Sequence, residues 1–410
     1  MKSLKFVITI WLLLFTYQLI ACTTYIISGK FTPDGKPILF KHRDTDQVKN
    51  SLVLFNDGKY KYMGVVNGTE KGWDKSVWGG YNETGFAIIN SAAYNNNIDD
   101  TTSLRGRDGV LMKRALMVCS SLEDFEKFLD TLKKPYGVNS NYGVIDASGG
   151  AAYYETGNYK YVKFDANDPA TAPDGIIIRT NHSMSSDLSK GFGFNRYETA
   201  RALLSEAAKS KNLTPQYLMK SIPRSLYHAR IGRDLSHNMP AKRDVPQYEF
   251  FVDYIPRLST TSSFMIVGVN DKDHVDETMM WTILGFPLTS PALPAWLSSG
   301  EVPKALAMDK EYESPICTAS LKFKDDCFPI KTDNGTNYIN LSAVINKEKK
   351  GYLQMLMPLE KRIFDKTNLL LSEIEKGTKS KEDILLLYNW IDELLSTQYK
   401  ELFNYDLFKN

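Results

Sequence analysis

A strand is predicted to begin where an export leader ends. The chain opens with a basic start, an apolar run over residues 6–15 and a small residue at Ala21, which together are typical of a secretory signal. The run is shorter than the ~20 apolar residues of a membrane-spanning helix. Residues 22–28 are rich in β-branched side chains, which favours a buried strand. We expect residues 1–21 to be removed, which would make Cys22 the first residue of an exported chain, periplasmic or extracellular.

Further strands and helices alternate in blocks. This pattern predicts an α+β layered architecture rather than regular βαβ units. We expect residues 22–300 to form one catalytic domain, and residues 301–410 to form a mainly helical extension that could pack on it or join two copies in a homo-oligomer. Strands are predicted at 22–28, 37–40, 85–90, 142–147, 150–155, 159–164, 175–179, 261–269 and 277–284, and helices at 108–133 (two), 196–208 and within 344–403.

Charge and motif content exclude several classes of protein. Without the two lysines of the leader, 48 basic side chains stand against 48 acidic ones. This balance gives no reason to expect a nucleic-acid partner. No later segment is long and apolar enough to span a membrane. The histidines lack His-Glu-x-x-His spacing and no Cys-x-x-Cys pair exists, so neither a metal nor a cofactor is predicted.

Three of the four cysteines have ordinary explanations. Cys119 lies in an apolar helical pattern and is predicted to be a buried packing residue. Cys317 and Cys327 could form a disulfide across a short loop in an exported protein. Cys22 is left without a structural explanation.

Two interpretations compete for Cys22. Residues 19–22, Leu-Ile-Ala-Cys, fit the pattern at which bacterial lipoproteins are cleaved and acylated, which would make the chain a lipid-anchored binding protein. Alternatively, cleavage frees a thiol and an α-amine on one residue. A lipid anchor is usually followed by a polar, flexible tether. Because a strand follows Cys22 directly, we favour a nucleophile fixed in the fold, and the anchor remains the alternative.

An N-terminal cysteine carries its own base. The thiolate is the reactive form, and an α-amine with a pKa of ~7.7–8.0 can accept the thiol proton. Such a site also needs a cation, a carboxylate to hold the amine, and donors to an oxyanion. Arg43 can supply the charge, and Asp46, three residues further on, can accept from the amine. The side-chain amides of Asn82 and Asn181 are candidate oxyanion donors.

Taken in order, these segments resemble the cysteine-dependent N-terminal-nucleophile hydrolases. That group contains choloylglycine hydrolases, penicillin V acylases and isopenicillin N acyltransferases. The resemblance covers about residues 22–205 and rests on Cys22-Thr-Thr, Arg43 with Asp46, Gly80-Tyr-Asn-Glu-Thr-Gly85, the hairpin from Gly143 to Glu155, Arg179-Thr-Asn-His182 and Arg196-Tyr-Glu-Thr-Ala-Arg201.

The resemblance implies a four-layer αββα sandwich with the nucleophile at a strand start. It makes Cys22 the nucleophile and base, Arg43 the stabiliser of thiolate and substrate, and Asp46 the partner of the amine. Asp44 is an additional carboxylate nearby, and the choice of Asp46 rests on the Arg-x-x-Asp spacing.

The same resemblance assigns the remaining polar groups and the reaction. Asn82 becomes the oxyanion donor, Asn181 a second polar clamp, and Arg196 matches a further arginine of the family. The implied activity is hydrolysis of a small-molecule linear amide through a Cys22 thioester, with acyl transfer to an amine as a variant. The exported dipeptidases that begin with a similar Cys-Thr are a further alternative.

Overall fold

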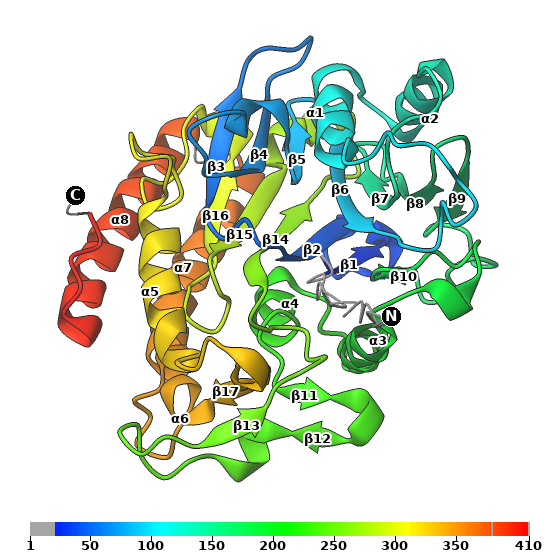
Figure 1. Cartoon of the computed structure of the whole chain (residues 1–410). Coiled ribbons are helices and arrows are strands. Elements are labelled where there is room, and N and C mark those ends of the chain that lie inside the picture. Colours follow the sequence, from blue (N-terminus) through cyan, green and yellow to red (C-terminus); the bar gives the residue numbers. More distant parts are fainter. Residues whose placement is uncertain (1–20, 379, 409–410) are drawn as a thin grey trace, which may run out of the picture.

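Two antiparallel sheets lie face to face in the computed structural model, which describes residues 21–378 and 380–408 (Figure 1). The first sheet has six strands, and the strand that begins at Cys22 lies second from one edge of it. In spatial order the strands are β10 (Ile176–Arg179), β1 (Cys22–Ile27), β2 (Ile38–Asp44), β14 (Thr260–Val267), β15 (Met279–Leu284) and β16 (Leu293–Trp296).

The second sheet has seven strands that follow one another in chain order. Each pairs with the next, so its topology is a continuous meander. The strands are β3 (Asn50–Phe55), β4 (Tyr62–Asn67), β5 (Gly79–Asn82), β6 (Ala87–Ala92), β7 (Ser140–Ile145), β8 (Ala151–Thr156) and β9 (Tyr161–Asp165).

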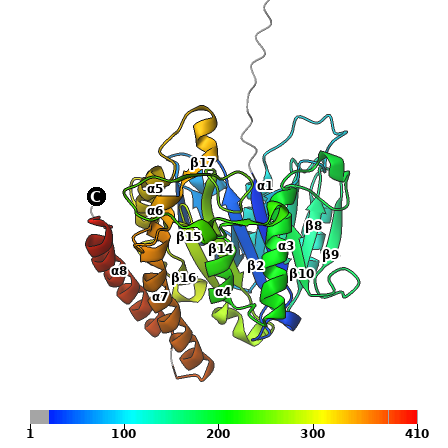
Figure 2. The ribbon, with the colours of Figure 1, turned by 90° about the horizontal axis from the view of Figure 1, so that it is seen from below.

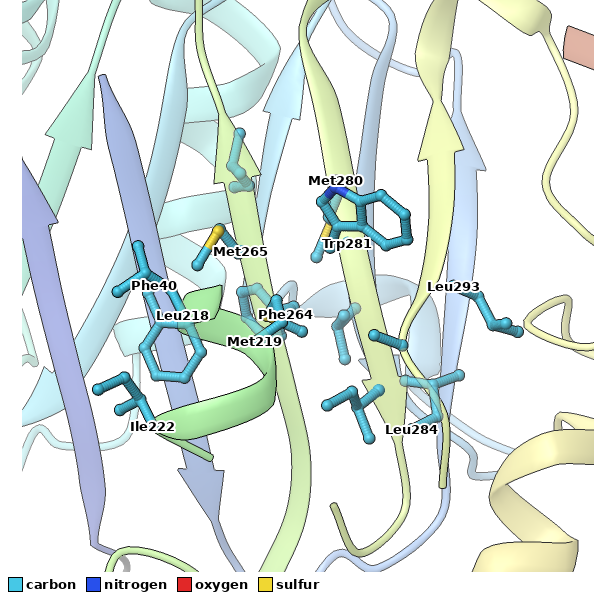
Figure 3. Close-up of a cluster of buried hydrophobic side chains, with 14 of the residues drawn as sticks. Phe40, Leu218, Met219, Ile222, Phe264, Met265, Met280, Trp281, Leu284 and Leu293 are labelled. Carbon is cyan, nitrogen blue, oxygen red and sulfur yellow. The ribbon is translucent and has the colours of Figure 1, made fainter. Parts of the chain in front are cut away.

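Helices cover the outer face of each sheet. On the seven-stranded sheet lie α1 (Asp108–Val118) and α2 (Leu122–Thr131), which begins at the N-cap Ser121. On the six-stranded sheet lie α3 (Phe194–Lys209) and α4 (Pro215–Ser221). Figure 3 shows Leu218 and Met219 of α4 beside Phe40 of β2 and Met265 of β14. The layers are therefore helix, sheet, sheet, helix, and the predicted αββα fold class is confirmed.

The C-terminal helices extend the layer on the six-stranded sheet. They run along one side of the molecule (Figure 2). Trp281 of β15 stacks on Phe364 of this segment with ring centroids 3.8 Å apart. One hydrophobic core therefore joins both parts of the chain, and the domain boundary at residue 300 stays a prediction. The helices are α5 (Pro315–Cys327), α6 (Leu341–Val344), α7 (Tyr352–Glu375) and α8 (Lys381–Phe403).

The two sheets pack closely because glycines stand where they meet. A side chain at Gly79 would come within 2.6 Å of the Phe264 ring, and one at Gly143 within 3.0 Å of Leu39. Two short ribbons lie outside the sandwich: β11 (Tyr227–His228) with β12 (Arg233–Asp234), and β13 (Tyr248–Phe250) with β17 (Tyr338–Asn340).

The cysteine predictions have different outcomes. Cys119 is buried next to α1, as predicted. Cys317 and Cys327 are both free, so the disulfide that the sequence left open is not formed. They lie ten residues apart on α5 and are therefore separated by about 15 Å along the helix axis, at 1.5 Å per residue. The predicted leader falls almost entirely outside the described residues. Within the described part, no helix is long and apolar enough to cross a membrane.

Candidate active site

Cys22 begins β1 in a buried position, with β2 on one side of the strand and β10 on the other. Its side chain is 4% exposed, and its residue pairs directly with Arg43 on β2. Side chains alternate along a strand, so Thr24 and Lys41, which also pair with each other, lie on the same face as Cys22 and Arg43. This is the face that meets the seven-stranded sheet, because Lys41 donates to groups on that sheet.

Two residues distant in sequence hold the backbone of Cys22. Its nitrogen donates to Oδ1 of Asn181 at 3.2 Å. Nη1 of Arg196 donates to the carbonyl oxygen of Cys22 at 2.6 Å and to Oγ1 of Thr23 at 2.9 Å. Nη2 of the same guanidinium donates to Oδ1 of Asn181 at 2.7 Å. The start of β1 is thus fixed at both of its backbone polar groups by side chains that also contact each other.

The position of Arg196 depends on the loop before α3. Gly193, the N-cap of α3, has φ +81°, and a side chain there would come within 2.4 Å of Nη2 of Arg196. Glycine adopts this left-handed conformation without steric cost. Burial, and then the positive charge of Arg257, lower the pKa of Arg196 to about 9, so the guanidinium remains a cation at neutral pH.

Arg43 is held in a fixed orientation beside Cys22. Nη1 donates to Oδ1 of Asn50 at 2.5 Å and Nη2 to Oδ1 of Asn67 at 2.8 Å. The guanidinium carbon lies 4.7 Å from the centre of the Trp78 ring. Burial lowers the pKa of Arg43 to about 10, and the Cys22 sulfur acts against that change. Arg43 was predicted from the sequence, and the structure places it next to the cysteine.

The two aspartates after Arg43 do not hold the nitrogen of Cys22. Asp46 is exposed, and its carboxylate accepts only from Thr45 and Gln47 among the contacts that the structure gives it. Asp44 points to the opposite face of β2, where it accepts from Arg257 at 2.6 Å. In the uncleaved chain the nitrogen of Cys22 therefore contacts Asn181 and not Asp46, and the predicted pairing of Asp46 with the freed amine stays a prediction.

Asn82 is the last residue of β5, in the seven-stranded sheet. Its Nδ2 donates to the carbonyl oxygens of Leu116 and Cys119 at the end of α1, at 2.9 and 2.8 Å. Its Oδ1 accepts from Thr84 and from the backbone of Phe86. Both amide hydrogens are used on a helix end, so the structure does not support the predicted oxyanion role of Asn82.

Several polar groups near Cys22 were not selected from the sequence. Lys41 and Tyr94 lie close enough to Cys22 to interact with it electrostatically, and Asn90 accepts a hydrogen bond from Lys41 at 2.6 Å. A usable signal was present, because residues 41–44 place a charged or titratable side chain at every position of a segment that otherwise reads as a buried strand.

The histidines near the site do not contact the thiol. His42 lies on the helix-facing side of β2, where it is bonded to Thr260 and Ser263. Burial lowers its pKa to about 4. His182 stacks on Phe194 and is bonded to Thr180. Among the residues that the structure describes, no cluster of His, Cys, Asp or Glu side chains could hold a metal ion.

A pocket of about 280 Å³ opens beside the start of β1. Ala21, the residue before Cys22, is part of its lining. The lining combines aromatic rings with charged groups, which suits a ligand that has both an apolar and a polar part. It includes Tyr94, Asn181, Phe192, Arg196, Phe251, Asp253 and Arg257.

Fold and site together have the architecture of an N-terminal-nucleophile hydrolase: two facing antiparallel sheets between helices, with a cysteine at a strand start. A family model, acyl-coenzyme A:6-aminopenicillanic acid acyl-transferase, matches residues 32–223. This range contains Arg43, Asn181 and Arg196 and begins after Cys22. The match confirms the resemblance to the cysteine-dependent amidohydrolases and acyltransferases of this group.

Among solved structures, similar chains are found at low sequence identity and with TM-scores below 0.5. An N-acylethanolamine-hydrolyzing acid amidase ortholog from Caenorhabditis elegans is 14% identical with a TM-score of 0.42, covering 63% of this chain and 99% of its own. Penicillin V acylase from Agrobacterium tumefaciens is 14% identical with a TM-score of 0.38, covering 68% and 86%. A conjugated bile acid hydrolase mutant from Clostridium perfringens is 12% identical with a TM-score of 0.37, covering 67% and 92%. No curated protein matches the chain.

Proposed function

We propose that this chain is an exported hydrolase of small linear amides that uses Cys22 as an N-terminal nucleophile after residues 1–21 are removed. One observation carries the proposal: the nitrogen of Cys22 is held by Asn181, and Asn181 is held in turn by Arg196. A buried backbone N–H needs an acceptor in any strand, and after cleavage the same acceptor would hold the α-amine of Cys22 in a fixed position.

The chemistry follows from the groups around Cys22. The α-amine accepts the thiol proton, and the thiolate sulfur attacks the amide carbon to form a tetrahedral intermediate. The C–N bond then breaks, the leaving amine takes the proton, and a thioester remains on Cys22. A water molecule, losing a proton to the α-amine, attacks the thioester carbon. The C–S bond then breaks, the acid leaves, and the sulfur recovers the proton from the amine. An amine acceptor in place of water would give acyl transfer.

Two buried arginines supply permanent positive charge on either side of the nucleophile. Arg43 lies on the face between the sheets, and Arg196 contacts the backbone from α3. A fixed guanidinium favours the thiolate and a developing oxyanion without reorganisation at the moment of reaction. Asn181 contributes its acceptor oxygen to Cys22, while its Nδ2 donates to the carbonyl oxygen of Ala92 at 2.9 Å. We therefore assign Asn181 to positioning.

The pocket beside Ala21 is the proposed substrate site. Its aromatic residues Phe192 and Phe251 suit an apolar acyl group, and Arg257 and Asp253 suit a polar amine portion. Small peptides such as dipeptides are also linear amides and belong to the same chemical class of candidate substrate. Association of two copies through the helical C-terminal segment stays a prediction.

The decisive experiment blocks the α-amine. A chain of residues 22–410 is compared with one that keeps two extra residues before Cys22, both checked by intact mass. The blocked amine cannot accept a proton, so amide hydrolysis is expected to fall by ~10²–10⁴ and to return when the extension is clipped. Full activity with a proven extension would contradict the mechanism. An intact mass of the exported protein that includes a diacylglycerol and a fatty acyl group would instead support the lipid-anchored alternative.

A further inference from the structure

The buried lysine beside Arg43 has no assigned role in the mechanism. Lys41 is 1% exposed on β2, one pleat away from Arg43 and on the same face. Across the strand pair it stands opposite Thr24, which lies two residues after Cys22 on the same face. The ammonium therefore lies between the two sheets, two residues along the strand pair from Cys22 and Arg43.

Neutral acceptors surround this ammonium. Nζ donates to the carbonyl oxygen of Trp78 at 2.7 Å and to Oδ1 of Asn90 at 2.6 Å. In the described part of the chain, no carboxylate lies within ion-pair distance of Nζ. An ammonium has three donors, and two are used in these contacts. Burying a lysine without a counter-ion is costly, so a purely structural tie between the sheets would be better made by a neutral side chain.

The polar contacts of Lys41 continue across the second sheet. Nδ2 of Asn90 donates to Oγ of Ser140 at 3.0 Å, and Ser140 donates to the carboxylate of Asp108 at the start of α1. This chain of hydrogen bonds fixes Asn90, and Asn90 fixes the ammonium. The hydrogen bonds that fix the Lys41 ammonium through Asn90 therefore run through strands of the second sheet to the start of α1.

Cys22 lies close enough to this ammonium to interact with it electrostatically. Burial lowers the pKa of Lys41 to about 7, and the largest opposing influence is Cys22, ahead of Asp108. The other charged or titratable groups that act on Lys41 or Cys22 are Arg43, Tyr94 and Arg196. A thiolate and an ammonium stabilise each other, so each ionised form favours the other.

We propose that the Lys41 ammonium is a positioning charge of the active site that holds the Cys22 sulfur as a thiolate from the space between the sheets. The inference rests on the proposed role of Cys22 as the nucleophile. Arg43 and Lys41 then act on the sulfur from adjacent positions of one strand. Lys41 acts through the sulfur, not on the substrate, so its removal changes the pH at which the site becomes active.

The test measures the thiolate directly, without a substrate. The rate of iodoacetamide alkylation at Cys22 is followed from pH 5 to 10 in the mature chain, with the modified peptide identified by mass spectrometry. Lys41→Met should move the midpoint upward by about one unit, since an opposite charge nearby lowers a thiol pKa by roughly that amount or more. Alkylation below both midpoints then becomes roughly tenfold slower. Lys41→Arg, which keeps a cation, should retain most of the wild-type profile.

A second buried lysine provides the matched control. Lys324 on α5 donates to the carbonyl oxygen of Thr260, and burial lowers its pKa to about 8. Lys324→Met removes a similar buried charge and should leave the Cys22 profile in place. If Lys41→Met does not fold, Lys41→Gln, which can still donate to Trp78 and Asn90, replaces it. An unchanged midpoint in a folded Lys41 variant overturns the inference, even where amide hydrolysis is intact. A shifted midpoint with no amidase activity supports the inference and contradicts the proposed function.

Discussion

At the scale of single residues, the site combines a buried thiol with cations that have almost no carboxylate among them. Arg43 is oriented by two asparagine oxygens, and Arg196 by a carbonyl oxygen, a hydroxyl and Asn181. Neutral acceptors satisfy the donors without cancelling the charge. The positive field therefore remains available to the sulfur and to a developing oxyanion.

We predict that Arg43→Lys slows amide hydrolysis although it keeps the positive charge. The planar guanidinium reaches Asn50 and Asn67 together and stacks on Trp78, and a single ammonium cannot reproduce that fork. A displacement of ~1 Å at a reacting group costs about 100-fold, and kcat/KM should fall by that order.

The control for this variant is Arg224→Lys. Arg224 is equally buried and forms a fork to Glu360, away from Cys22. It should lower the stability of the protein while leaving kcat/KM of the folded enzyme within about threefold. Near-normal rates for Arg43→Lys would show that a diffuse positive charge is sufficient at this position.

At the scale of elements, the site forms where β1, β10 and α3 meet. β1 pairs with β2 on one side and with β10 on the other, and the residues just after β10 include Asn181. α3 begins after Gly193 and brings Arg196 to the same point within its first turn. The segment after β10 therefore brings Asn181 to Cys22, and the segment before α3 brings Arg196 to it. The conformation of the second segment depends on Gly193.

We predict that Gly193→Ala disables the enzyme by displacing Arg196. The residue has φ +81°, and the new methyl group would meet Nη2 of Arg196 at 2.4 Å. Activity should fall on the order of 10–100-fold as Cys22 loses its fixed position. Gly232→Ala is the matched control: its φ is +61°, and no atom lies within 4 Å of the added carbon. Both variants carry the left-handed strain of ~1 kcal/mol, so equal losses of activity would mean that strain alone is responsible.

At the scale of the whole molecule, a buried ion pair joins the C-terminal helices to the sandwich. Glu360 of α7 accepts from both terminal nitrogens of Arg224, at 2.7 and 2.5 Å, and from the backbone of Ala292 at 2.6 Å. Both side chains are 2% exposed. The C-terminal segment is therefore part of the folding unit rather than an appendage.

We predict that Glu360→Gln lowers the free energy of unfolding by about 3–5 kcal/mol, because it leaves the Arg224 charge buried without a counter-ion. Urea unfolding followed by fluorescence measures the change. The control is Glu198→Gln, which breaks the more exposed pair with Arg230 and should cost less than about 1 kcal/mol. A loss below about 1 kcal/mol for Glu360→Gln would show that the C-terminal helices are only loosely attached.

The sequence by itself determined the features that depend on local pattern. The strand at Cys22, the helices of 108–133 and the helix that carries Arg196 follow from residue periodicity and turn chemistry, and the order of short motifs indicated the fold class. Arg43, Asn181 and Arg196 were selected from those motifs, and the structure brings all three to Cys22.

Only the tertiary structure decided which of several similar polar groups face the nucleophile. Asn181 rather than Asp46 holds the nitrogen of Cys22, because the pairing of β1 with β10 joins residues 159 positions apart. Asn82 binds the end of α1, and Lys41 faces the thiol, because the packing of the second sheet on the first sets both environments. Strand alternation shows that two residues share a face, but the element that covers that face is a long-range property of the fold.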